Sequence, residues 1–137
     1  MKKFLWIMLV LVMLVGCSSG TTKEDTEKAA YIEGVEFEEI YRAYKENKLA
    51  AEDVYQYNRY KITAEINGMA TGGLNNMTGG ATLTMTKRIG NKIAVFYAEF
   101  EKEQEENLKK VKVGDTISFI GKCYGVGNWV ECELITE

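Results

Sequence analysis

The 137-residue sequence contains no histidine and no proline, and it has only three cysteines. Histidine is the commonest general base and the commonest transition-metal ligand, so its absence narrows the routes to catalysis and to metal binding. Without proline, the turns must be built mainly from glycine and asparagine. We therefore expect a protein that is not an enzyme, and we predict neither a metal nor another cofactor.

The sequence also lacks an excess of positive charge. It carries 17 Lys and Arg residues against 20 Asp and Glu residues, which gives a net charge of −3. Nucleic-acid-binding proteins usually show a basic patch or stripe, because neutralising phosphates supplies most of their affinity. This balance argues against nucleic acid as a partner.

The N-terminus has the three parts of a secretory signal. Lys2 and Lys3 precede an unbroken apolar run, 4–15, which is shorter than the roughly 20 residues that span a bilayer. The run ends in Leu-Val-Gly followed by Cys17. This ending resembles the lipobox of bacterial lipoproteins, in which the cysteine receives a diacylglycerol before the chain is cleaved just ahead of it. The alternative is a short membrane helix with an incidental cysteine.

The resemblance to a lipobox implies three segments. Residues 1–16 would be the signal peptide, residues 17–30 the acylated Cys17 with a polar tether, and residues 31–137 the exported domain. Cleavage would remove two of the 17 basic residues and leave a net charge of about −5. We expect an exported protein held to the extracytoplasmic face of the cell membrane by lipid on Cys17, since two acyl chains suffice for stable anchoring.

Hydrophobic periodicity predicts helices first and strands afterwards. Apolar residues recur every three or four positions from Val35 to Tyr44, which indicates an amphipathic helix, and 49–55 reads as a second short helix separated from it by Asn47. From Tyr60 onward the apolar period becomes two. Five segments are predicted as strands, with a long loop at 69–80 and a charged helix or coil at 101–108: 60–67, 81–86, 93–100, 115–126 and 129–136.

Five strands with a helix between the third and the fourth are typical of an OB-fold barrel. We predict a mainly β protein, an OB-fold-like barrel of five strands preceded by one or two N-terminal helices. An SH3-like barrel and an open meander fit the same pattern. The third strand, 93–100, is apolar on both faces, so its register is not determined by the sequence.

The two remaining cysteines lie on either side of the last predicted turn. If Gly127 and Asn128 are the turn residues, Cys123 and Cys132 face each other as a non-hydrogen-bonded pair, where the Cα atoms approach to about 4.5 Å. A disulfide accepts that distance, and an oxidising compartment favours the bond. We therefore predict a Cys123–Cys132 disulfide; the alternatives are two buried free thiols or, less favoured, a metal site.

Two stretches are similar to a known family. They are Tyr44-Lys45-Glu46-Asn47-Lys48-Leu49-Ala50-Ala51-Glu52-Asp53 and Val113-Gly114-Asp115-Thr116-Ile117-Ser118-Phe119-Ile120-Gly121-Lys122-Cys123, the latter followed by Val130-Glu131-Cys132. Together they resemble the tRNA-anticodon-binding-like family of OB-fold proteins, many of them bacterial lipoproteins. The resemblance covers roughly 37–135. It implies an OB-fold with preceding helices and says little about activity.

OB-fold barrels usually bind ligands on the face of strands two and three, between the first and last inter-strand loops. Aromatic side chains at such a rim stack on sugars, peptides or bases. Trp129 could equally cover the barrel edge. The candidate ligand-binding residues are Thr82, Thr84, Thr86, Tyr97, Tyr124 and Trp129.

The leading functional hypothesis is a non-catalytic OB-fold module, tethered to the cell envelope, that binds a protein, a peptide or a glycan. An accessory structural subunit of an envelope complex is the alternative. A metal-dependent hydrolase or nuclease built from scattered acidic residues ranks last, because no spacing marks its ligands.

Overall fold

The computed structural model describes residues 30–72 and 79–136. The predicted signal peptide, Cys17 and the tether up to residue 29 lie outside the described residues. From Tyr31 onward the chain groups as one unit. Among the helices that the structure describes, none combines the length and the apolar character needed to cross a bilayer.

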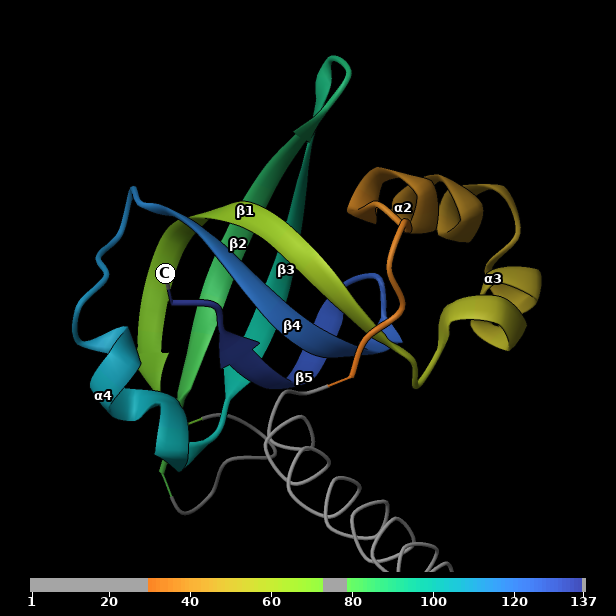
Figure 1. Cartoon of the computed structure of the whole chain (residues 1–137). Helices are drawn as coiled ribbons and strands as arrows, with labels where there is room; N and C mark the ends of the chain where they lie inside the picture. The colour runs from red at the N-terminus through yellow and green to blue at the C-terminus, as the bar shows by residue number, and fades with distance from the viewer. Residues whose placement is uncertain (1–29, 73–78, 137) are drawn as a thin grey trace, which may run out of the picture. The chain divides into compact units, whose positions relative to one another are not determined.

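Five strands form a closed barrel, as the sequence predicts (Figure 1). The strand order is β1-β2-β3-β5-β4, in which β3 and β5 pair in parallel and β1 closes the sheet on β4. A closed sheet excludes the open meander and agrees with the OB-fold-like barrel. The strands are β1 (Arg59–Thr71), β2 (Ala81–Ile89), β3 (Lys92–Phe100), β4 (Thr116–Gly125) and β5 (Asn128–Leu134).

Alternation of apolar and polar residues decides which side of each strand faces the core. In β1, Tyr60, Ile62, Ala64 and Ile66 are buried and the residues between them are exposed. In β3, Ala94, Phe96 and Ala98 are buried, which fixes the register that the sequence left open. The residues of β3 between these therefore point outward.

Two helices precede the barrel, α2 (Phe37–Glu46) and α3 (Lys48–Tyr55). Phe37, Ile40 and Tyr44 lie on one face of α2 and are buried against the barrel core, and the Phe37 ring stacks on Phe96 at 4.5 Å between centroids. Asn47 ends α2 and caps α3, since its Oδ1 accepts a hydrogen bond from the Ala50 N–H at 3.2 Å. Both predicted helices are confirmed.

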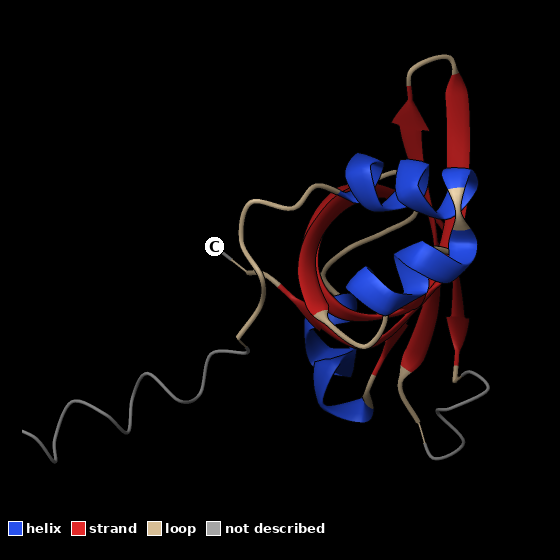
Figure 2. Cartoon of the chain, turned by 90° about the vertical axis from the view of Figure 1, so that its right-hand side faces the viewer, coloured by secondary structure: helices blue, strands red, loops and turns tan. Residues whose placement is uncertain are grey.

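A short helical segment separates β3 from β4. It consists of the 3-10 turn η2 (Lys102–Gln104) and α4 (Glu105–Leu108), and Leu108 is buried. In Figure 1, α4 lies at the lower left of the barrel, whereas α2 and α3 lie to its right. The β2–β3 hairpin extends past α2, as Figure 2 shows.

The predicted loop at 69–80 begins too early. Met69, Ala70 and Thr71 continue β1 and pair with Leu83, Thr82 and Ala81 of β2. A bulge between Ile66 and Gly68 shifts the register there, so the alternating pattern breaks although the strand continues.

The predicted register of the last hairpin is wrong. Gly125 pairs with Asn128, so the turn is Val126-Gly127, and Cys123 faces Trp129 rather than Cys132. Two further irregularities shift β5 against β4. Glu131 lies at one of them with a left-handed φ of 50°, and its carboxylate lies 3.7 Å from both Arg59 and Lys122.

The predicted Cys123–Cys132 disulfide is absent. Both thiols are free and buried. Cys132 is carried to the β3 side of the sheet, where it pairs with Phe100, while the Cys123 Sγ lies 3.8 Å from the Tyr44 hydroxyl. The bulged register separates two residues that an unbroken hairpin would place opposite each other.

Candidate ligand-binding site

The outer surface of β2 and β3 combines threonines with exposed apolar side chains. Thr82, Thr84 and Thr86 point away from the core, because Leu83 and Met85 between them are fully buried. On β3, the side chains of Ile93, Val95 and Tyr97 are 59%, 57% and 49% exposed. Cross-strand pairing places Thr86 beside Val95 and Thr84 beside Tyr97. We call this surface the threonine–tyrosine face: Thr82, Thr84, Thr86, Ile93, Val95 and Tyr97.

The hydroxyl groups of this face differ in their availability. Thr82 Oγ1 donates a hydrogen bond to the Gly72 carbonyl at 2.7 Å, so it holds the start of the β1–β2 loop. Thr84 has Gly68 as its β1 partner, a residue without a side chain, which leaves the threonine and Tyr97 open on that side. Thr84 and Tyr97 therefore form the accessible polar centre of the face.

Charged residues surround the face. Arg88 is exposed and pairs with Ile93, whereas Lys92 pairs with the buried Ile89 on the opposite side of the hairpin. Glu65 pairs with Thr86 and Glu99 pairs with Thr82. The hairpin end of the face therefore carries Arg88, with Glu65 beside Thr86, and the opposite end carries Glu99.

Tyr97 also connects the face to the β4–β5 turn. Its backbone N–H donates a hydrogen bond to the Gly127 carbonyl at 2.9 Å, and it pairs with Asn128 of β5. Tyr124, on the same hairpin, is 51% exposed. The structure thus brings four of the six predicted residues together on one face, Thr82, Thr84, Thr86 and Tyr97, whereas Tyr124 packs against Tyr57 on the β4–β5 hairpin.

The sixth residue, Trp129, is not at the rim. Its side chain is fully buried, its Nε1–H donates to the Val126 carbonyl at 3.1 Å, and its ring lies 6.1 Å from that of Phe37. The turn begins one residue earlier than predicted, and both Trp129 and Val130 are buried. Trp129 is therefore a core residue.

Sequence reasoning missed Ile93 and Val95 as surface residues. The signal was present, because 93–100 is apolar on both faces. Such a strand is usually covered on both sides. Here one side is covered by the core and the other is exposed, which is typical of a surface that docks a partner.

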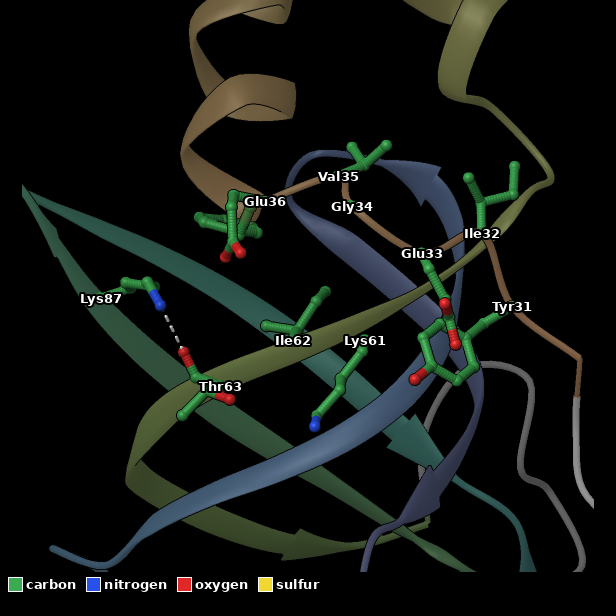
Figure 3. A pocket seen from close by; sticks show the side chains of 11 residues that line it. Tyr31, Ile32, Glu33, Gly34, Val35, Glu36, Lys61, Ile62, Thr63 and Lys87 are labelled. Carbon is green, nitrogen blue, oxygen red and sulfur yellow. Dashed lines mark hydrogen bonds between the residues drawn. The ribbon is translucent and has the colours of Figure 1, made fainter.

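A hollow of about 320 Å³ lies between the segment before α2 and strand β1 (Figure 3). Lys87 Nζ lies at its edge, where it donates to the Thr63 carbonyl at 2.7 Å and lies 3.7 Å from the Glu38 carboxylate. Lys61 and Glu33 also line it, so both charge signs are present. Lys87 is engaged in joining α2 to the sheet.

The Cys123 and Cys132 thiols and the Tyr44 phenol are buried in the core, and none of them belongs to the threonine–tyrosine face. Burial raises the pKa of Cys132 and of Cys123, and burial together with the neighbouring Cys123 raises the pKa of Tyr44. A raised pKa keeps each group protonated at neutral pH, so none of them is activated as a nucleophile.

No protein-family model matches this chain, and a comparison with curated proteins gives no significant match. Among solved structures, it resembles a candidate nucleic acid-binding lipoprotein from Klebsiella pneumoniae subsp. pneumoniae. The TM-score is 0.58 with 12% identical residues, over 82% of this chain and 96% of that one. It also matches a mitochondrial single-stranded DNA binding protein from S. cerevisiae, with a TM-score of 0.44, 13% identity, and coverage of 60% and 97%. At 12% identity, the Klebsiella likeness concerns the fold alone.

Proposed function

We propose that this chain is a lipid-anchored, non-catalytic binding module of the cell envelope that docks a protein partner on its threonine–tyrosine face. The observation that carries the proposal is the exposure of three large apolar side chains, Ile93, Val95 and Tyr97, on consecutive outward positions of one strand. A contiguous apolar patch of this kind on a folded domain marks an interaction site.

The chemistry of the face favours a protein over a sugar or a nucleic acid. Branched aliphatic side chains such as Ile93 and Val95 gain little from hydroxyl-rich or phosphate-rich ligands, whereas they pack well against apolar side chains. Tyr97 offers an aromatic anchor of the type that dominates binding energy at interfaces. Arg88 at the hairpin end complements an acidic group on the partner.

A capture experiment with matched variants tests this proposal. The full chain, solubilised in detergent and immobilised through its C-terminus, is exposed to envelope extract as wild type, Val95→Glu and Val113→Glu. Val113 is the control, because its side chain is 55% exposed against 57% for Val95 but lies outside the face. We expect one protein to be retained by the wild type and by Val113→Glu and lost with Val95→Glu. Equal retention by all three would contradict the proposal.

Membrane anchoring through Cys17 is the second part of the proposal. It is supported by the lipobox-like sequence and by the lipoprotein description of the Klebsiella neighbour. Cys17→Ser removes the thiol that accepts the lipid. We expect the variant to lose the added lipid mass and the mature chain to be absent from the membrane fraction. An unchanged mass and fractionation would contradict the anchor.

Nucleic-acid binding is the second candidate function, although the acidic composition argues against it. It is favoured by what the Klebsiella neighbour is described as binding, and by Tyr97 and Arg88 on the same side of the β2–β3 ladder. Titration with a labelled single-stranded oligonucleotide at two salt concentrations tests it. Affinity that falls steeply with salt and is weakened by Arg88→Gln would favour this function.

Two hypotheses remain: an accessory structural subunit of an envelope complex, and a metal-dependent hydrolase or nuclease. A docking face of this kind also serves an accessory subunit of an envelope complex, in which case one partner dominates at native abundance. A hydrolase or nuclease requires turnover of a glycan or an oligonucleotide that depends on added divalent metal. Detection of such turnover, and its loss on mutation of paired acids, would replace the binding proposal.

A further inference from the structure

A separate pocket of about 370 Å³ lies between the N-terminal helices and the β4–β5 hairpin. We call it the corner pocket. The backbone of Gly125–Gly127 forms one wall. Its side chains come from four elements, α2, α3, β4 and β5: Tyr44, Lys45, Lys48, Glu52, Tyr124 and Asn128. None of these side chains belongs to the threonine–tyrosine face, and the helices that complete the pocket lie outside the barrel.

The Tyr124 ring forms the aromatic wall of the corner pocket, and the Tyr57 ring packs against it. The Tyr124 ring meets the Tyr57 ring edge-on, with 5.4 Å between centroids and an interplanar angle of 81°. Tyr57 has φ 68°, in the left-handed region that an aromatic residue rarely adopts. Its backbone N–H donates to the Cys123 carbonyl at 2.6 Å, which fixes this conformation.

The left-handed φ of Tyr57 belongs to the turn between α3 and β1, in which the Asn58 N–H donates to the Tyr55 carbonyl at 3.3 Å. The side chains of Tyr57 and Tyr124 are 57% and 51% exposed, so neither contributes much to the core. The pair therefore presents an aromatic surface beside a polar hollow.

The polar groups of the pocket determine which ligand fits. Asn128 offers an amide and Glu52 a carboxylate, which are planar groups that hydrogen-bond to vicinal hydroxyls. Lys48 Nζ lies 3.8 Å from the Glu52 carboxylate. Among the described residues Lys45 has no carboxylate partner, and its Nζ lies 5.3 Å from the centroid of the Tyr41 ring. The pocket therefore carries one uncompensated positive charge on an acidic protein.

We propose that the corner pocket binds a saccharide that carries a carboxylate. The C–H face of a sugar ring would stack on Tyr124, its hydroxyls would bond to Asn128 and Glu52, and its carboxylate would pair with Lys45. The proposal goes beyond the docking of a protein partner, since it uses different side chains. A negative result for the saccharide proposal therefore leaves the docking proposal standing, and the reverse also holds.

The test is a titration of the full chain, in detergent micelles, with oligogalacturonate as the acidic probe and chitotetraose as the neutral one. We expect saturable binding of the acidic oligomer, at least roughly tenfold tighter than that of the neutral one. Lys45→Gln should remove this preference, and Tyr124→Ala should weaken binding of the acidic probe about tenfold. Val95→Glu, which alters the other face, should leave both affinities unchanged.

Tyr57→Gly tests whether the Tyr57 ring contributes to ligand binding or only to stability. Glycine adopts φ 68° without strain, so the urea midpoint of unfolding should stay constant or rise, while binding of the acidic probe weakens about fivefold. No saturable binding of either oligosaccharide would overturn the proposal. So would equal affinity for both probes, unchanged binding by Tyr124→Ala, or binding of a peptide or an oligonucleotide alone at these residues.

Discussion

The backbone N–H of Tyr97 donates a hydrogen bond to the carbonyl of Gly127 at 2.9 Å. This bond joins the middle of β3 to the turn between β4 and β5. On its other side, β3 is held by the β2 ladder, where Tyr97 faces Thr84. The exposed Tyr97 ring thus projects from a backbone held on both sides, so binding a partner costs little backbone entropy there.

The burial of Trp129 predicts a stability effect rather than a binding effect. Trp129→Ala removes a fully buried ring that packs against Phe37 and Tyr60, so it should lower the free energy of unfolding by about 3–5 kcal/mol. The exposed Tyr124 on the same hairpin provides the control, and Tyr124→Ala should change stability by no more than about 1 kcal/mol. Urea unfolding measures both. Similar losses for the two variants would contradict the buried position of Trp129.

Replacing Gly121 with a larger residue should destabilise the protein, because the Cys132 sulfur lies close to it. A Cβ at Gly121 would come 2.9 Å from the Cys132 Sγ and 3.3 Å from the Phe119 ring. Gly121→Ala should therefore lower the free energy of unfolding by about 1–3 kcal/mol. Gly127→Ala is the matched control, since nothing lies within 4 Å of its added Cβ.

A double-mutant cycle attributes the cost to the sulfur. In a Cys132→Ala background, Gly121→Ala should cost less than it does in the wild type, because the nearest obstructing atom is gone. Additive losses would show that the two side chains are not in contact and that the bulged register of β5 is wrong.

The two core cysteines should behave as free, protected thiols. Both are buried and burial raises the pKa of each, so a maleimide should react with neither in the folded protein at neutral pH. Denaturation without a reductant should then allow both to be labelled in a Cys17→Ser background. If neither cysteine is labelled after denaturation, the disulfide that the sequence predicts is present.

Stability should fall in alkali. Burial raises the pKa of Cys123 and Cys132 above the ordinary value of 9.0. The stability contribution of each protonated thiol is complete below that value. It is lost as pH rises, because the unfolded chain releases protons that the folded chain retains. Each thiol should reduce the free energy of unfolding by up to about 1.4 kcal/mol per pH unit.

Urea titrations at several alkaline pH values measure this slope. The slope should become shallower in Cys132→Ala and shallower again in the variant that lacks both core cysteines. Replacing the exposed Val113, which carries no titratable group, with alanine should leave the slope unchanged. A slope that is the same with and without the thiols would show that they ionise equally in both states.

The sequence predicts the fold well where its signals are local. Periods of three to four residues locate α2 and α3, alternation locates the strands, and the Asn47 cap is found by its side-chain chemistry. The errors lie where pairing between strands decides the outcome. The bulges between Ile66 and Gly68 and around Glu131 leave no clear local trace, so the predicted end of β1 and the predicted Cys123–Cys132 register are wrong.

The candidate site is predicted in the same partial way. Alternation suffices to place Thr82, Thr84 and Thr86 outward, and the fold places Tyr97 beside them. It does not suffice to separate Trp129 from the rim, because the irregularity at Glu131 breaks the alternation of β5 and leaves both Trp129 and Val130 buried. The corner pocket depends on α2 and α3 meeting that turn, a contact between segments far apart in the sequence.

In-cell photo-crosslinking tests the docking face most directly. A photoreactive amino acid is placed at Val95, at Tyr97 or, as the control, at Val113 in the full chain, and adducts are identified after irradiation. We expect one dominant protein adduct from Val95 and Tyr97, weakened when Arg88 is changed to glutamate, and none from Val113. Absence of an adduct from both face positions, or the same adduct from Val113, would contradict the docking face.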